Sequence, residues 1–342
     1  MFSIKLNGRW LRQIAGYSPP TVEFGLHGSE AASWEMSPTF RHPTLRAGVA
    51  VQIYDGGAPH WFGYLLEPGS DGQINAVGLW REAETTPCLD QFGALTRNPF
   101  QAVYGARARL DVRWGQPATS GLVDADWSTD VSTDMSLADL LDSWAAGAGL
   151  RCSINGNGEF EAKVDPTTPQ WHVPHSVAGR GLTPAEDEFY THVTGTYLSS
   201  PGVFGSRTIG STEAAVVFRR RTLDVGDHLI NKGVISAATA DAELSGIFLK
   251  VGARMGWAEG LELSRGEIVN GGGIPAPLNQ VRAGQMIRLR GTVDVSRANR
   301  IAAFTDVLIA SSKYTDGSAE ISLSPYGYAP RNLAGVLEEA VS

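Results

Sequence analysis

Two histidines in the stretch WHVPH have the residue type and the spacing of metal ligands. His172 and His175 stand three residues apart, which would place both imidazoles on one face of a helix. Pro174 lies between them and Pro169 precedes them, so a helix is not expected here, and no third ligand is apparent. We therefore predict two histidines on an exposed extended segment and no metal site.

The stretch DADWSTDVSTD carries aspartates that could coordinate calcium through their carboxylate oxygens. An EF-hand loop would require an acid or amide at Ser128, glycine at Thr129 and glutamate at Met135, and the sequence fails at each position. We predict instead a polar loop that leads into a helix beginning near Ser136. The aspartates are Asp124, Asp126, Asp130 and Asp134.

The stretch GVAVQIYDGGAPHWFGYLLEP combines glycines, a histidine and an acid, so it could cradle a phosphate or hold a catalytic group. Residues 49–53 alternate in the period-two pattern of a half-buried strand. The glycines tolerate positive φ, and no helix N-terminus follows them to bind an anion. We predict a hairpin whose exposed tip contacts a subunit or partner through Asp55, Gly56, Gly57 and His60.

The signatures of several common enzyme classes are missing. No serine stands in G-x-S-x-G, and no glycine-rich loop is followed by Lys-Ser or Lys-Thr. The NGNG run at 155–158 lacks the third glycine and the helix of a dinucleotide site, so it predicts a hairpin turn. We predict that the chain is not an enzyme and has no cofactor.

The alternative function is that of a carbohydrate-binding or glycoside-hydrolysing cell-wall protein. The 9 tryptophans could stack on sugars, although Trp80 and Trp144 lie in the apolar periodic settings of a core. Carboxylates two residues apart would share one face of a strand, as would ordinary surface acids. These pairs are Glu82 with Glu84, and Glu186 with Glu188.

Arg219, Arg220 and Arg221 form the strongest basic run of the chain. On a strand the middle side chain would point away from the other two, so the run is not one patch of positive charge. A solvated or salt-bridged strand explains it, since charge runs usually mark a solvated face. Contact with an acidic partner subunit, or with nucleic acid passing through a pore, is the functional interpretation.

The composition indicates a globular chain rich in short strands. The 342 residues include 40 glycines and 18 prolines spread along the chain, and the net charge of −8 argues against a general nucleic-acid-binding surface. Cys88 and Cys152 lie too far apart for a CxxC site and are interpreted as free thiols of a reducing compartment. The first residues contain no apolar region typical of a signal peptide, and no continuous run of apolar residues is long enough to span a membrane.

Strands and helices alternate in a definite order. Strands are expected around residues 49–54, 61–66, 73–80, 187–198, 261–268, 285–295, 301–312 and 318–323. Residues 136–149 predict a helix, with Ser136 and Asp139 as a capping box, followed by a hairpin around NGNG. A longer helix is expected near 236–254, and a short amphipathic helix near the end would present Leu333 and Leu337 as further contacts.

Three stretches in this order resemble hub proteins of the tail tip or baseplate of tailed phages, which are related to the hub part of type VI secretion spikes. The first is Ala47–Gly63, with its pattern of alternating apolar residues followed by Gly, Phe and Gly. The second is SLADLLDSWAAGAGLRCSINGNGEFEAK. The third is FYTHVTGTYL with the helix and VRAGQMIRLRG that follow it, and the closing SPYGYAPRNLAGVLEE resembles the end of siphophage minor tail proteins.

The resemblance implies a mainly β, α+β fold with two small β-barrels of similar fold. The first β-barrel module would comprise residues 1–104 and 186–225, with an inserted helix and hairpin module at 105–185. The long helix and the second β-barrel module would occupy residues 226–330, and a tail or short helix residues 331–342. Three copies would form a ring that joins the sixfold tail tube to the threefold tip and helps form the DNA exit channel. The chain has no spike-needle or lysozyme-like extension, so a membrane-piercing role for it is not expected.

The partners implied are the distal tail ring, the C-terminus of the tape-measure protein, and fibre or tip proteins. DNA would be met only in passage. The protein would be assembled in the host cytoplasm and reside at the tail tip of the virion.

Overall fold

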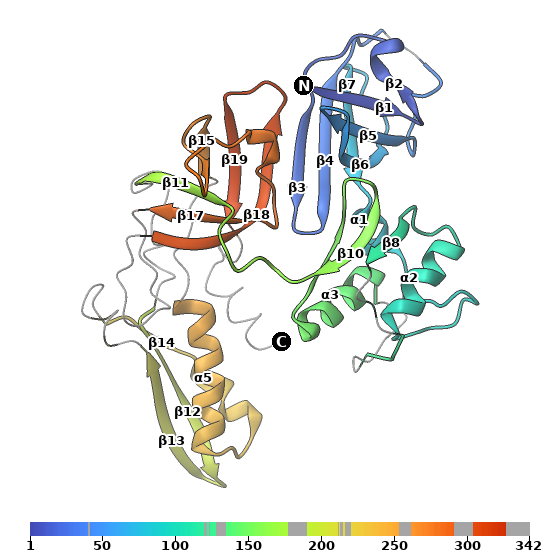
Figure 1. The fold of residues 1–342 in the computed structure, drawn as a ribbon. Helices are drawn as coiled ribbons and strands as arrows, with labels where there is room; N and C mark the ends of the chain where they lie inside the picture. The colour runs from blue at the N-terminus through green and yellow to red at the C-terminus, as the bar shows by residue number, and fades with distance from the viewer. Residues whose placement is uncertain are drawn as a thin grey trace.

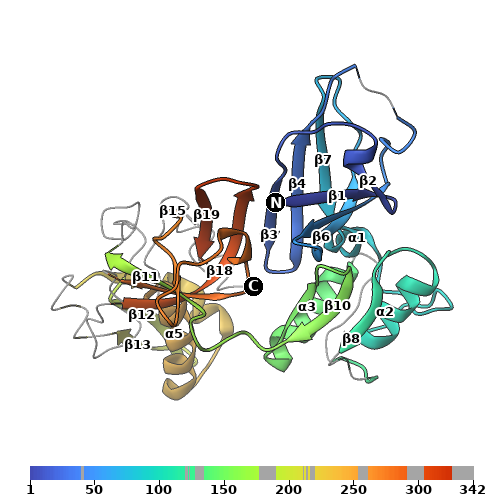
Figure 2. The same cartoon turned by 45° about the horizontal axis from the view of Figure 1, so that its top comes forward.

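The fold is mainly β with a few helices, as the sequence predicted. The computed structural model describes residues 1–39, 42–119, 122, 124–127, 135–176, 190–210, 212, 215, 220–252, 261–290 and 304–325. Figures 1 and 2 show two sheet units side by side, a helical insertion beneath one of them and an outer unit extending from the other. Whether each sheet unit closes as a barrel stays a prediction.

The N-terminal unit is an antiparallel sheet in the order β3-β4-β7-β6-β5-β1-β2. Alternation places Val51 and Ile53 fully inside, beside Ile4 and Trp61, as expected for strands with one buried face. A 3-10 turn, η1 (Leu11–Gln13), follows β2. The strands are β1 (Phe2–Leu6), β2 (Arg9–Trp10), β3 (Thr21–Gly25), β4 (Gly28–Glu35), β5 (Ala50–Asp55), β6 (Ala58–Leu65) and β7 (Gln73–Gly78).

The strand expected at 73–80 ends two residues early. β7 stops at Gly78, whose Cβ, if present, would lie 1.6 Å from the carbonyl oxygen of Ser29, so only glycine permits this approach. Leu79 then adopts a right-handed helical conformation, and Trp80 begins a helix that the sequence pattern did not predict.

The helical insertion has its own apolar core, built from helices and a short hairpin. Ser136 and Asp139 form the predicted capping box, and Gly149 ends that helix with φ +66°. The predicted turn at 155–158 joins β9 and β10. The elements are α1 (Trp80–Thr85), α2 (Pro99–Ala108), β8 (Gly115–Thr119), α3 (Leu137–Ala148), β9 (Arg151–Ile154) and β10 (Glu159–Lys163).

The C-terminal unit is a second sheet with a separate core, and β18 is its longest strand. β18 also pairs with β3, from Ser312 opposite Phe24 to Thr315 opposite Thr21, so the two sheet units form one continuous sheet. β11 comes from the stretch grouped with the insertion, yet it pairs with β17 and β16 here. The elements are β11 (Trp171–Ser176), β15 (Leu261–Ser264), β16 (Val269–Asn270), η4 (Leu278–Gln280), β17 (Met286–Arg290), β18 (Phe304–Thr315) and β19 (Glu320–Pro325).

The outer unit is a three-stranded sheet in the order β13-β12-β14, covered on one face by α5. This differs from the sequence-based grouping of 186–225 with the first β-module. β12 pairs with both β13 and β14. Val193 and Tyr197 of β12 bury their side chains in one apolar core with Leu244 and Ile247 of α5, which stabilises the outer unit. The elements are β12 (His192–Ser200), β13 (Val203–Gly210), β14 (Thr222–Asp224), η2 (Gly226–His228), η3 (Ile230–Lys232) and α5 (Ala237–Gly252).

Candidate functional site: the junction of the sheet units

The β5–β6 turn forms the predicted hairpin. Gly56 and Gly57 have φ of +55° and +92°, and a Cβ on either would meet no atom within 4 Å, so the tip is open. Asp55 faces inward along the same chain: its carboxylate accepts a hydrogen bond from the Asn279 side chain of η4, and the N-terminal amine lies 3.9 Å away. Asp55, which was predicted to contact another subunit or partner, therefore binds the C-terminal unit of its own chain.

His60 is buried, which corrects its placement on the exposed tip. Only 1% of the residue is exposed, and its ring lies between Phe2 and Phe24, with centroid distances of 4.6 and 5.2 Å. The pairing of β6 with β5 shifts register between Ile53 and Tyr54, and His60 is the extra residue at that irregularity. His60 and Trp61 are therefore both buried although they are consecutive, which the two-residue period of a strand does not predict.

Arg282 binds His60 across the two units. Its Nη2 lies 2.6 Å from Nδ1 of His60, and its guanidinium lies 5.0 Å from the centre of the Phe24 ring. A guanidinium only donates, so Nδ1 accepts and the imidazole proton is on Nε2. Burial, and then the positive charge of Arg282, lower the pKa of His60 to about 3, so the ring is neutral.

Arg151 is a second buried cation of the junction. Its Nε donates to Asp165 over 2.6 Å, Nη1 to the carbonyl of Leu26 over 2.7 Å, and Nη2 to the carbonyl of Gly284 over 3.3 Å. One side chain therefore connects the hairpin of the insertion to both sheet units. Gly284 has φ +79°, and a Cβ there would lie 2.5 Å from the guanidinium, so glycine is required.

The cavity between these groups measures about 150 Å³. Pockets that hold small molecules usually occupy about 300–1,000 Å³. The polar side chains around it bind one another and the main chain, which is the behaviour of a structural joint. Its charged and titratable lining residues are His60, Arg151, Glu161, Lys163 and Arg282.

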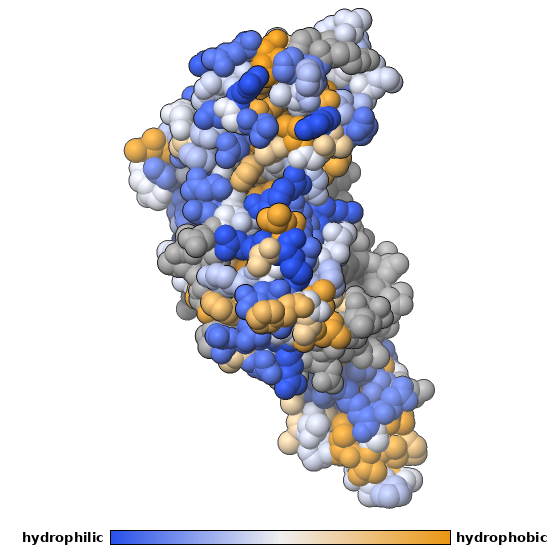
Figure 3. All heavy atoms as spheres, turned by 90° about the vertical axis from the view of Figure 1, so that its right-hand side faces the viewer, coloured by the Kyte–Doolittle hydropathy of each residue, from blue (hydrophilic) through white to orange (hydrophobic). Residues whose placement is uncertain are grey.

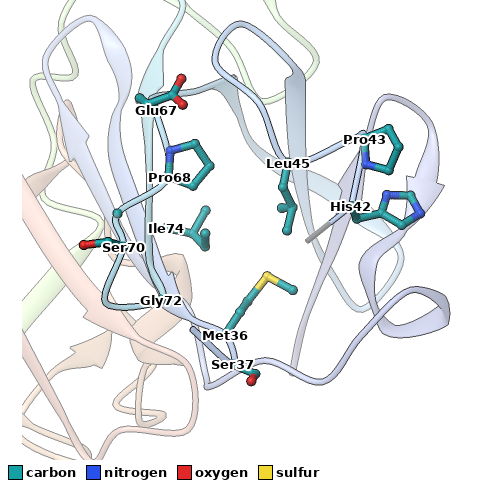
Figure 4. A pocket seen from close by; sticks show the side chains of 11 residues that line it. Met36, Ser37, His42, Pro43, Leu45, Glu67, Pro68, Ser70, Gly72 and Ile74 are labelled. Carbon is teal, nitrogen blue, oxygen red and sulfur yellow. The ribbon is translucent and has the colours of Figure 1, made fainter. Parts of the chain in front are cut away.

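A larger cavity, of about 540 Å³, lies at the far end of the N-terminal unit. Figure 4 shows Met36, Leu45 and Ile74 pointing toward one another, with Glu67 at the edge. Glu67 is the single acid among the described lining residues. Glycoside hydrolysis ordinarily needs two carboxylates flanking the bond, so this cavity does not supply the constellation of the alternative function.

The other predicted chemical residues lie elsewhere, each in a structural setting. Glu82 is 2.5 Å from Arg113, and Glu84 is 2.6 Å from Arg81. Asp124 accepts hydrogen bonds from the side-chain amides of Asn98 and Gln101. Asp126 forms an ion pair with Arg97 at 3.1 Å. Among the residues that the structure describes, no three His, Cys, Asp or Glu side chains converge as a metal site would require.

The two predicted histidines and the two tryptophans lie where the sequence placed them. His172 and His175 lie on the extended β11, as expected. Trp80 and Trp144 are each 6% exposed and belong to the core of the insertion, also as expected. Glu186, Glu188, Asp130 and Asp134 lie outside the described residues.

The basic run does not join the junction. Arg220 is exposed, and the main chain of Arg221 exchanges hydrogen bonds with Thr191 beside β12 of the outer unit. Arg219, Leu333 and Leu337 lie outside the described residues. The structure thus brings Asp55 and His60 together with Asn279, Arg282 and Arg151. Arg151 and Arg282 lie within the stretches that resemble hub proteins, but nothing in those stretches marks either arginine as part of a site.

Cys88 and Cys152 are free and buried. Burial raises the pKa of the Cys88 thiol to about 11 and raises that of Cys152 further. We expect neither to react with a thiol reagent in the folded chain at pH 8, and both to react on unfolding in guanidinium. The exposed variant Ser70→Cys should react at once in the same assay, and prompt labelling of the native chain would contradict the buried positions.

The fold resembles that of phage tail proteins. The prophage MuSo2 43 kDa tail protein from Shewanella oneidensis superposes with a TM-score of 0.60 at 14% identity, over 96% of this chain and 99% of that chain. The tail protein from Neisseria meningitidis MC58 gives a TM-score of 0.51 at 10% identity, over 96% and 97%. At these low identities the similarity establishes the fold alone. The resemblance to phage tail proteins that the sequence suggested is therefore confirmed for the fold.

No family profile and no curated protein sequence matches the chain. No helix in the described parts is long and apolar enough to cross a membrane.

Proposed function

We propose that the chain is a structural subunit of a phage tail, and that three copies form the hub at the tail tip. The observation that carries this proposal is the near full-length likeness of fold to the 43 kDa tail protein, which spans both sheet units and the insertion between them. The continuous pairing of β18 with β3 supports it, because a ring subunit must hold its two units in a fixed relation.

In this proposal each sheet unit closes as a small barrel, and three chains place six barrels around a channel through which DNA passes. The distal tail ring, the C-terminus of the tape-measure protein and the fibre or tip proteins contact different faces of this ring. The chain performs no catalysis, needs no cofactor, and resides in the virion at the tail tip after assembly in the host cytoplasm. The enclosed Arg282–His60 joint and the cavity with a single acid are consistent with that role.

Native mass spectrometry of the purified chain tests the trimer. We expect a species of three times the 36.5 kDa subunit mass that persists on dilution to low micromolar concentration. A stable monomer or dimer over the same range would contradict the trimeric hub. Antibody labelling of phage particles containing the chain, viewed by electron microscopy, should mark the end of the tail, and labelling of the head would contradict a tail location.

A further inference from the structure

The cavity of about 150 Å³ at the junction carries an excess of positive charge. Its charged lining side chains are three cations and one acid, namely Arg151, Lys163, Arg282 and Glu161. Lys163 pairs with Glu161 at 2.5 Å, and the Arg151 Nε donates to Asp165 over 2.6 Å. Two of the three cations therefore have a carboxylate partner of their own, and Arg282 is left.

Arg282 has no carboxylate partner among the residues that the structure describes, where its guanidinium forms no ion pair. Asp55 lies near enough to raise the pKa of Arg282. That carboxylate already accepts a hydrogen bond from Asn279 and faces the N-terminal amine at 3.9 Å. His60 is neutral, so it binds the guanidinium without balancing its charge.

The cavity also has hydrogen-bond donors that are not in use. Arg282 donates from Nη2 to Nδ1 of His60 over 2.6 Å and from Nη1 to the His60 carbonyl over 3.5 Å. Its Nε donates to no described residue, and a guanidinium carries five N–H groups, so the larger part of this fork is unused. Ser29 lines the same cavity and is 5% exposed; its hydroxyl accepts from the Phe62 amide, and its own proton has no acceptor among the described residues.

A positive charge in this position is costly without a counterion. Figure 3 shows hydrophilic residues, in blue, facing solvent over much of one side of the molecule, where water surrounds their charges. Arg282 is instead half-buried beside the Phe24 ring, and burial lowers its pKa because removal from water disfavours the charged form. An anion in the cavity would reduce this cost and accept hydrogen bonds from the unused donors.

We propose that the cavity binds a small inorganic oxyanion of the size of phosphate. Its volume corresponds to that of about five water molecules, and phosphate has five non-hydrogen atoms. Arg282 and Ser29 donate hydrogen bonds to the oxyanion, since the planar fork of a guanidinium matches two phosphate oxygens. Arg151 and Lys163 add positive potential from the insertion. The bound anion links both sheet units and the hairpin of the insertion, and this inference concerns the chain by itself, independently of its assembly into a tail.

Phosphate titration of the full chain tests this inference. Urea unfolding is followed by tryptophan fluorescence at pH 7.5, in phosphate from zero to about 20 mM, with the ionic strength held constant by sodium gluconate, a larger organic anion. We expect the ratio of folded to unfolded chain to rise saturably by about tenfold, as for a dissociation constant of about 2 mM. No rise, or a rise that does not saturate and so reflects a general salt effect, would overturn the inference.

Two glutamine variants assign the effect to the cavity. Arg282→Gln removes the charge and keeps an amide that can donate to His60, whereas Arg9→Gln makes the same change at an exposed position of β2. The phosphate-dependent rise should fall from about tenfold to less than about twofold in Arg282→Gln and stay unchanged in Arg9→Gln. Equal rises in the two variants would place the anion elsewhere and overturn the inference.

Sodium chloride in place of phosphate distinguishes an oxyanion from a halide. Chloride should stabilise the parent much less, because a single atom accepts from fewer of the unused donors. An equal effect of chloride that is lost in Arg282→Gln would indicate a halide site and overturn the assignment to an oxyanion.

Crystals of the full chain soaked in sodium selenate give a direct test, which remains decisive if Arg282→Gln does not fold. Selenate is a tetrahedral oxyanion whose selenium is located by anomalous scattering. We expect a peak within hydrogen-bond reach of the Arg282 guanidinium. Peaks confined to the outer surface, with none in the cavity, would overturn the inference.

Discussion

Replacing His60 with asparagine is expected to remove much of the acid sensitivity of the folded chain. Burial beside Arg282 lowers the pKa of His60 from 6.5 to about 3. Between those values the unfolded chain binds the proton and the folded chain does not, so lowering the pH favours unfolding. The stability due to the neutral ring is complete above about pH 6.5 and declines by up to about 1.4 kcal/mol per pH unit as the pH falls toward 3.

Asparagine suits this test because its side-chain oxygen can accept the Arg282 hydrogen bond that Nδ1 now accepts. Guanidinium unfolding at pH 7, 6, 5 and 4, followed by tryptophan fluorescence, gives the free energy of unfolding at each pH. The parent should lose markedly more stability than His60→Asn between pH 6 and pH 4. The control, His172→Asn, makes the same substitution at a histidine of β11 outside the junction. Parallel curves for the parent and His60→Asn would contradict the proposed environment of His60.

Replacing Arg282 with alanine should destabilise the chain by about 2–4 kcal/mol at pH 7, because it leaves a buried acceptor without its charged donor. The substitution removes the hydrogen bond to His60 and the contact with the Phe24 ring. Burial lowers the pKa of Arg282 and the nearby Asp55 carboxylate raises it, so the substitution also removes one of the cations close to Asp55. The stabilising free energy that is lost belongs to the contact between the N-terminal and C-terminal sheet units.

Chemical unfolding at pH 7 measures this effect. Arg9→Ala, at an exposed position of β2, is the matched control and should change the free energy of unfolding by less than about 0.5 kcal/mol. If Arg282→Ala and Arg9→Ala proved equally mild, the guanidinium would not be a structural part of the junction. A second variant, Arg282→Lys, should recover only part of the stability, because an ammonium lacks the planar fork of donors.

These effects concentrate at one place because the two sheet units meet through few strands. β3 and β18 carry the continuous pairing, and Arg282 and Arg151 add hydrogen bonds on either side of the small cavity. Each cation binds groups from segments far apart in the chain: Arg282 and His60 are 222 residues apart, and Arg151 and Gly284 are 133 apart.

Local patterns in the sequence were sufficient to predict many of the elements. The alternation of apolar residues in β5 and β7 follows from the two-residue period of a strand, and the capping box at Ser136 follows from hydrogen bonds within four residues. The helix α2 was missed although Asn98 caps it and Pro99 occupies its first turn, which is a typical helix start. The helix α1 is only 6 residues long and has no side-chain cap, so little in the sequence marks it.

The sequence by itself determined the mainly β class, the hairpins, α3 and α5, the apolar cores and the order of elements that resembles tail hub proteins. Only the tertiary structure decided that His60 is buried, that Arg282 and Arg151 join the units, and that β12–β14 form a separate sheet. The physical reason is range: periodicity, caps and turns depend on neighbours in the chain. The ionisation of His60 and the pairing of a strand depend instead on groups that folding brings together from distant positions.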